Sequence, residues 1–194
     1  MHIGLFGGTF DPPHVGHLIV AEAARDQCEL DQVWWIPARR SPHKLDKGIS
    51  PACYRLAMTR RATAGHDGFV VSELELGRPA PSCTVDTVRQ VCAENPNDTF
   101  SLLIGGDHLE QFTTWVEPKA IAALVPLIVY PRPGASIGQL PAYLDGRVQY
   151  VRAPMLDIAA SDIRMRVRCE RSIRYLVSES TRTYIREEGL YRNR

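Results

Sequence analysis

Two histidines, His14 and His17, lie three residues apart in the segment GGTFDPPHVGH near the start of the chain. At the start of a helix this spacing places both imidazoles on one face, beside the positive end of the helix dipole. They could hydrogen-bond phosphate oxygens, ligate a metal, or serve only in capping and packing. A metal would need a third ligand, for which Asp11 is the obvious nearby candidate, and HExxH spacing is absent. The pattern therefore favours phosphate over the other two roles.

The residues that precede the histidines suit the same kind of ligand. Gly7 and Gly8 lack side chains, so the backbone can approach a ligand closely. Thr9 offers a hydroxyl, and the amides of Thr9 and Phe10 could donate to a phosphate at the helix start. The segment matches neither GxxxxGK[ST] nor GxGxxG, so the signatures of P-loop enzymes and of dinucleotide-dependent hydride transfer are missing.

Strand-like and helix-like segments alternate along the rest of the chain. Strands are expected at 2–7, 32–38, 68–74, 99–106, 125–134 and 148–154, and helices at 14–28, 50–64, 84–95, 109–124, 160–169 and 178–190. Pro118 predicts a helix start or break inside 109–124. Such alternation predicts right-handed crossovers and a doubly wound α/β fold with a parallel sheet.

In such sheets ligands bind beyond the carboxyl ends of the strands. Four chemically rich loops are expected to gather there, namely GGTFDPPHVGH, ARRSPHK, GGDH and LDIAASDIR. The strand pattern and the residue chemistry therefore point independently to one site.

Composition limits the classes of function. The 194 residues fit a single domain over 1–194, with a small C-terminal helical segment from about residue 157. A net charge of +1 argues against a nucleic-acid or membrane partner, and IAALVPLIVY is too short to span a bilayer. The N-terminus does not read as a signal peptide, and five cysteines without a CxxC pair favour a reducing cytoplasm.

Several motifs, in order, resemble one family. GGTFDPPHVGH resembles the signature of the nucleotidylyltransferase superfamily, which has a Rossmann-like fold. SPHK, GRPAPSCTVDTV, LLIGGDHLEQFTTW, DIAASDIR and SIRYLVSESTRTYIREEGLY then resemble segments of the bacterial nicotinate-nucleotide adenylyltransferases. The resemblance runs from Ile3 to Tyr191 and implies transfer of the adenylyl group of ATP to nicotinate mononucleotide, giving deamido-NAD and pyrophosphate.

The resemblance also implies a set of site residues. Those expected to be catalytic are His14, His17, Lys44 and Arg164. Those expected to bind ATP are Gly7, Gly8, Thr9, Phe10, His17, Gly105, Asp107, Ser161 and Arg164. Those expected to bind nicotinate mononucleotide are Thr9, His43, Lys44, Thr84 and Trp115. Mg²⁺ is expected to arrive through the ATP phosphates, with no metal site made by the protein.

Each of these assignments has a physical rationale. The Asp107 carboxylate could accept from ribose hydroxyls, although a helix N-cap is an alternative for it. Trp115 offers a flat face to a cationic pyridine ring, where core packing is the alternative. Thr84 could hydrogen-bond the nicotinate carboxylate, and Arg164, expected in the first turn of its helix, could grip phosphate with two donors.

Two departures from the family pattern leave alternatives open. Ala159, Ala160 and Ser161 stand where the family has two serines and a threonine, so two hydroxyls are missing beside the expected triphosphate. Cys83 replaces an aromatic residue near the pyridine pocket. An acceptor such as nicotinamide mononucleotide or phosphopantetheine, or a regulatory protein with weakened catalysis, is the alternative reading. Whether the chain forms a homo-oligomer is left open by the sequence.

Overall fold

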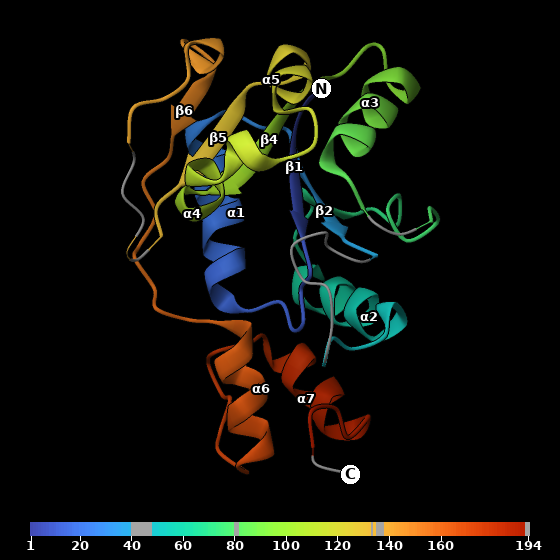
Figure 1. Ribbon diagram of the computed structural model, residues 1–194. Coiled ribbons are helices and arrows are strands. Elements are labelled where there is room, and N and C mark those ends of the chain that lie inside the picture. The colour runs from blue at the N-terminus through green and yellow to red at the C-terminus, as the bar shows by residue number, and fades with distance from the viewer. Residues whose placement is uncertain (40–47, 80–81, 133, 135–137, 193–194) are drawn as a thin grey trace.

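The computed structural model describes residues 1–39, 48–79, 82–132, 134 and 138–192. In this part of the chain six parallel strands form one sheet in the order β3-β2-β1-β4-β5-β6 (Figure 1). The strands are β1 (His2–Gly8), β2 (Gln32–Pro37), β3 (Phe69–Val71), β4 (Thr99–Gly105), β5 (Leu127–Tyr130) and β6 (Val148–Tyr150). The predicted parallel α/β sheet is confirmed.

Helices connect the strands at the expected places. They are α1 (Val15–Gln27), α2 (Ala52–Thr63), α3 (Thr84–Glu94), α4 (Gly106–Glu110), α5 (Pro118–Leu124), α6 (Ala160–Arg168) and α7 (Glu179–Glu187), with 3-10 turns at Phe112–Thr114 and Ala142–Leu144. Pro118 is the first residue of α5, where its missing N–H costs no hydrogen bond. The predicted helix over 109–124 is therefore broken into a 3-10 turn and α5, with α4 beginning before it at Gly106.

Side chains on alternate strand positions build a core on each face of the sheet. Leu5 of β1 packs with residues of α3 and α5 on one face, whereas its neighbour Phe6 packs with residues of α1 on the other. Trp35 of β2 is fully buried on the α1 side, and its ring lies 5.0 Å from the ring of Phe6. The two cores hold the carboxyl ends of the strands in a fixed arrangement.

A third core joins α2 to the C-terminal helices α6 and α7. Met58, Ile163 and Ile185 are at most 2% exposed within it. The backbone N–H of Val15, the first residue of α1, donates to the carbonyl of Leu176 at 2.9 Å. The C-terminal segment is thus anchored beside the loop that follows β1 (Figure 1).

The strand order reverses next to β1. The chain runs from β1 outward to β2 and β3, then crosses back so that β4 pairs with the other side of β1. The crevice at such a switch point is where open α/β sheets bind ligands. None of the helices in the described ranges is long and apolar enough to cross a membrane.

Candidate active site

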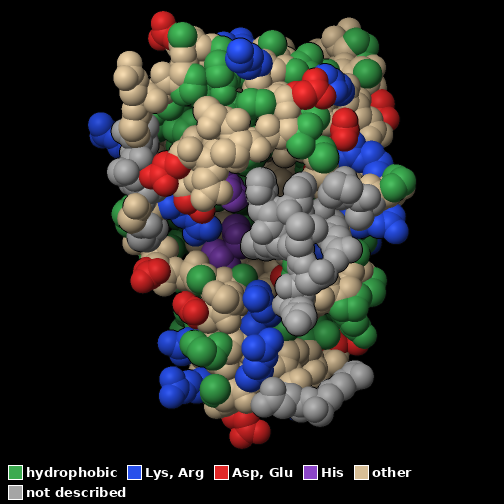
Figure 2. All heavy atoms as spheres, viewed as in Figure 1, with side chains coloured by type: hydrophobic (Ala, Val, Ile, Leu, Met, Phe, Trp, Pro, Cys, Tyr) green, Lys and Arg blue, Asp and Glu red, His purple; other side chains and the backbone are tan. Residues whose placement is uncertain are grey.

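A cavity of about 790 Å³ opens at the switch point, beyond the carboxyl ends of β1 and β4. Histidine side chains lie in the hollow between the sheet and the C-terminal helices (Figure 2). Its wall includes eleven of the predicted residues, namely Gly7, Gly8, Thr9, Phe10, His14, His17, Thr84, Asp107, Trp115, Ser161 and Arg164. Gly105 lies at the end of β4 just behind this wall, and His43 and Lys44 lie outside the described residues.

The two histidines form a stacked pair at the start of α1. His14 is the N-cap residue, and its ring lies 3.6 Å from that of His17, with 28° between the ring planes. The Nδ1 atom of His17 accepts the backbone N–H of His14 at 3.1 Å. A neutral imidazole that accepts at Nδ1 carries its proton on Nε2. The backbone therefore fixes His17 as a donor at Nε2.

Gly16 gives His14 the room that this stacking requires. A Cβ atom at position 16 would lie 3.1 Å from His14 Nδ1, closer than ordinary contacts allow. The His14 side chain is 4% exposed, and its burial, assisted by the positive charge of Arg132, lowers its pKa to about 4. His14 is therefore a neutral hydrogen-bonding group at pH 7 rather than a fixed positive charge.

This pKa makes a pH-dependent contribution to stability. The unfolded chain, with a His14 pKa near 6.5, takes up a proton before the folded state does, so stability falls as the pH drops from about 6.5 to 4. Between pH 7 and pH 4.5 this single group should cost about 2 to 3 kcal/mol. Urea unfolding should show that His14→Gln loses less stability than the wild type over this range. Equal losses in the two proteins would contradict the burial of a neutral His14.

Asp107 and Arg132 form an ion pair in the wall of the cavity, beyond β4 and β5. Asp107 is the second residue of α4, and Gly105 is the N-cap, so the alternative of an N-cap role for Asp107 is wrong. A Cβ at Gly105 would come within 2.3 Å of Asp107 Oδ1, so only glycine leaves this carboxylate its position. Arg132 Nε lies 3.7 Å from the same oxygen, as an ion pair too long for a hydrogen bond.

Arg132 was missed by the sequence reasoning. It follows β5, in the YPRPG segment, and therefore lies at the same edge of the sheet as the four loops selected from sequence. It also lines the cavity. The signal available in the sequence was the position of Arg132 just after a buried strand. No second polar motif in that loop strengthened this signal.

Arg164 contacts the loop after β1 and lies further along its helix than predicted. Helix α6 begins at Ala160, so Arg164 is its fifth residue, and the prediction that it lies in the first turn is wrong. Its Nη1 donates to the carbonyl of Asp11 at 2.7 Å. Ser161 stands exposed in the wall near the start of α6, whose N-cap Ala159 gives no side-chain bond. The guanidinium thus joins α6 to the loop after β1.

The other end of the cavity combines the indole face of Trp115 with polar side chains. Trp115 follows the 3-10 turn and packs on the buried ring of Phe112, with 5.3 Å between the ring centres. Thr84 starts α3 across the cavity, directly after the N-cap Cys83. Glu75, which sequence reasoning missed, is 7% exposed in the same wall.

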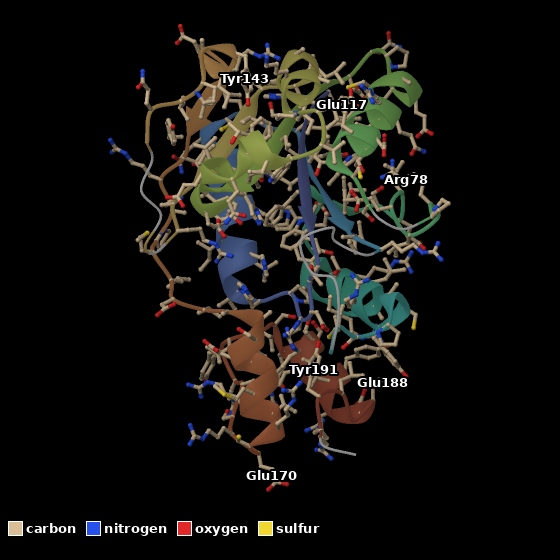
Figure 3. All side chains as sticks on the ribbon, viewed as in Figure 1. Arg78, Glu117, Tyr143, Glu170, Glu188 and Tyr191 are labelled. Atoms are coloured by element: carbon tan, nitrogen blue, oxygen red, sulfur yellow. The ribbon has the colours of Figure 1, made fainter. Side chains whose placement is uncertain are left out.

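The Glu75 carboxylate is held by its neighbours. Thr87 Oγ1 donates to Glu75 Oε1 at 2.7 Å, and burial raises the pKa of this carboxyl. Arg78 lies 3.9 Å from the same oxygen and reaches it from the loop before α3 (Figure 3). Across the described ranges no three His, Cys, Asp or Glu side chains gather as a metal site would require.

Comparison of the sequence with known proteins identifies the family of the chain. The cytidylyltransferase-like family model matches residues 5–166. A protein of Salinibacter ruber named "Probable nicotinate-nucleotide adenylyltransferase" is 45% identical over 192 residues, covering 99% of this chain and 98% of the relative. A protein of the same name from Geobacillus kaustophilus is 42% identical, covering 97% of this chain and 85% of the relative.

Solved structures agree on the fold. Plasmodium falciparum nicotinic acid mononucleotide adenylyltransferase complexed with NaAD superposes with a TM-score of 0.82 and 20% identity, covering 98% of this chain and 97% of the other. With a family model over most of the chain and full-length relatives above 40% identity, the chain belongs to the cytidylyltransferase-like family, in its nicotinate-nucleotide adenylyltransferase branch.

Proposed function

We propose that this protein transfers the adenylyl group of ATP to nicotinate mononucleotide, producing deamido-NAD and pyrophosphate in NAD biosynthesis. The observation that carries the proposal is one cavity that joins the histidine pair at the start of α1, which suits a phosphate, to the flat indole face of Trp115, which suits a pyridine ring. Relatives named for this reaction match over nearly their full length, which supports the choice of substrates.

The reaction needs positioning and charge neutralisation rather than a base. An oxygen of the mononucleotide phosphate attacks the α-phosphorus of ATP, and the bond to the β-phosphate oxygen breaks to release pyrophosphate. The attacking phosphate has a second pKa near 6, so it is mostly ionised at neutral pH. In this scheme His17 donates from Nε2 to the α-phosphate, while His14, Lys44 and Arg164 supply further donors or charge.

The remaining residues would hold the two substrates in line. Asp107 would accept from the ATP ribose, with Gly105 keeping space for its carboxylate. Ser161 and the backbone amides at the start of α6 would hold the outer phosphates, and two alanines in place of hydroxyl residues predict a weaker grip there. Thr84 and Trp115 would receive the nicotinate ring, and His43 and Lys44 its nucleotide phosphate.

Mg²⁺ would enter as part of the ATP complex. The donors around the cavity fit this mode, since the Asp107 carboxylate is paired with Arg132 and both Asp11 oxygens accept protein hydrogen bonds. When bound, the ion supplies neutralisation of phosphate charge through substrate oxygens and water. The protein's own cationic and donor groups would face the rest of that charge.

We also propose that residues 1–194 act as one unit in the cytoplasm. The C-terminal segment reaches the opening loop through two hydrogen bonds, from Arg164 to the Asp11 carbonyl and from Tyr191 to the Asp11 carboxylate. The loop proposed to receive phosphates is therefore braced by the C-terminal segment. Nucleic acid and membrane stay outside the proposed partners, because the net charge is only +1.

The test is pyrophosphate release with ATP and Mg²⁺, offering nicotinate mononucleotide, nicotinamide mononucleotide and phosphopantetheine separately. We expect turnover with the nicotinate form far above the other two. Equal use of both pyridine nucleotides would remove the acid preference and keep the chemistry. Turnover with phosphopantetheine alone would refute the proposed acceptor, and ATP binding without any turnover would favour the regulatory alternative.

Trp115→Ala should separate the two substrates. Loss of the flat ring removes a contact and cation–π contribution of about 1 to 2 kcal/mol, so KM for nicotinate mononucleotide should rise about 10-fold. The KM for ATP should change less than about 3-fold, and Trp115→Phe should lie between the two. Steady-state kinetics with each substrate varied will decide, and an equal rise for both substrates would contradict the placement of the pyridine ring at Trp115.

A further inference from the structure

A buried arginine lies next to the loop that follows β1, which is the loop proposed to bind phosphate. Arg55 of α2 is 1% exposed, and its three guanidinium nitrogens donate to three backbone carbonyls from separate parts of the chain. Nε donates to Ser50 at 3.0 Å, Nη1 to Thr9 at 2.9 Å and Nη2 to Arg39 at 3.1 Å. Arg55 does not line the cavity, so its contacts in the structure are with the backbone and not with the cavity itself.

The bonds of Arg55 close a ring with the opening loop. Asp11, two residues after Thr9, accepts the backbone N–H of Ser50 at 3.0 Å, while the Ser50 carbonyl accepts from Arg55. Tyr191 holds the other Asp11 oxygen at 2.7 Å, beneath the loop at the top of the C-terminal helices (Figure 3). Thr9 and Asp11 line the cavity, and these bonds hold them through Arg55, Ser50 and Tyr191, which do not line it.

This ring sets the direction of one peptide plane. In a planar trans peptide the N–H of a residue points opposite to the carbonyl of the residue before it. Because the Thr9 carbonyl is turned toward Arg55, the N–H of Phe10 is turned away from Arg55, and Thr9 and Phe10 both line the cavity. Phe10 has a φ of 48°, a left-handed conformation that a phenylalanine adopts only when its surroundings hold it there.

We propose that Arg55 is a positioning residue for the reaction: it orients the Thr9–Phe10 peptide so that the Phe10 amide donates to a substrate phosphate. The proposal rests on the proposed function for its substrates. The planar guanidinium is needed because it donates in three directions at once, which a lysine ammonium on a flexible stem cannot reproduce at these three carbonyls. A preorganised amide donor of this kind matters most where charge develops during the reaction.

The test compares Arg55→Lys with Arg61→Lys. Arg61 lies on the same helix, is exposed, and stacks over the ring of Tyr184 instead of touching the opening loop. For Arg55→Lys we expect kcat to fall about 10- to 100-fold with KM for both substrates changed less than about 3-fold. Arg61→Lys should keep wild-type kinetics. Thermal unfolding of both variants will report any purely structural cost.

A spectroscopic readout follows the amide itself. The chain has five phenylalanines, so protein labelled with ¹⁵N-phenylalanine gives a spectrum simple enough to assign. A methylene-bridged ATP analogue should move the Phe10 amide proton downfield in the wild type and in Arg61→Lys, and this shift should be lost in Arg55→Lys. The measurement needs no turnover, so it stays informative even if the proposed acceptor is wrong.

Two results would overturn the proposal. One is an Arg55→Lys protein that is less stable yet keeps kcat and the ligand-induced Phe10 shift, since Arg55 would then be structural only. The other is a wild-type Phe10 amide that does not respond to the analogue. If Arg55→Lys does not fold, Tyr191→Phe loosens the same ring through Asp11, and it should lower kcat several-fold with a smaller Phe10 shift. An unchanged kcat and shift in Tyr191→Phe would then count against the ring.

Discussion

His17→Ala should lower kcat by about 100- to 1000-fold while changing ATP affinity less than about 3-fold. The reason is the direction of its proton. His17 Nδ1 is occupied by the backbone N–H of His14, so the donor at Nε2 is fixed before substrate arrives. A fixed donor acts on the charge that shifts onto the α-phosphate in the transition state and adds little to binding of the ground state.

The stacked ring of His14 makes this donor more rigid. With its ring centre 3.6 Å from that of His17, His14 limits the rotation of the His17 imidazole. His17→Gln, whose amide nitrogen can reach a similar position, should recover part of the lost rate. His66→Ala is the matched control, since His66 pairs with Glu22 at 2.8 Å and does not line the cavity.

The measurements are steady-state pyrophosphate release and calorimetric binding of ATP. A His17→Ala protein with near-normal turnover would exclude His17 from the chemical step. A variant that loses ATP binding and rate in equal proportion would assign His17 to ground-state binding instead.

Arg164→Ala should reduce kcat/KM for ATP by about 100- to 1000-fold, with both a higher KM and a lower kcat. The guanidinium lines the cavity and at the same time donates to the Asp11 carbonyl. Its loss removes a charge-assisted donor to phosphate, and such bonds contribute about 1.5 to 3 kcal/mol each. It also loosens the loop that carries the amide donors, which adds a loss in kcat.

Two variants, Arg164→Lys and Arg168→Ala, serve as comparisons for Arg164→Ala. Arg164→Lys keeps the charge but cannot donate to Asp11 and to a phosphate with one planar group, so it should restore the rate only partly. Arg168→Ala changes an exposed arginine one turn further along α6 and should leave kinetics unchanged. ATP-dependent rates for the three variants decide, and equal effects of Arg164→Ala and Arg168→Ala would reduce the role of Arg164 to general surface charge.

The sequence was most informative where a pattern and a chemical type coincide. GGTFDPPHVGH predicted both a strand followed by a helix and a polar site, and β1, α1 and the cavity are found there. Short apolar runs bounded by turn residues, which are typical of buried parallel strands, located the six strands of the sheet in the described part of the chain. The order of the strands could not be obtained this way, since it depends on contacts between distant segments.

The residues that sequence reasoning missed act through such distant contacts. Arg55 lies in a helix that the sequence predicts, but no residue near it in the sequence indicates that its guanidinium donates to three backbone carbonyls, those of Thr9, Arg39 and Ser50. Glu75 and Tyr191 likewise become meaningful only when folding brings Thr87 and Asp11 to them. Local propensity carries no information on which backbone carbonyl a buried donor will meet.

The hydrogen bond from Tyr191 to Asp11 also has a consequence for the order of events during synthesis. Its two residues are 180 positions apart, so the loop after β1 can gain this particular bond only after Tyr191 has been synthesised. Folding from the N-terminus can build β1, α1 and β2 early, because their contacts are comparatively local. A growing chain can therefore hold β1, α1 and β2 in place while the loop between β1 and α1 still lacks its bond from Tyr191, and the loop gains that bond only as the last helices dock.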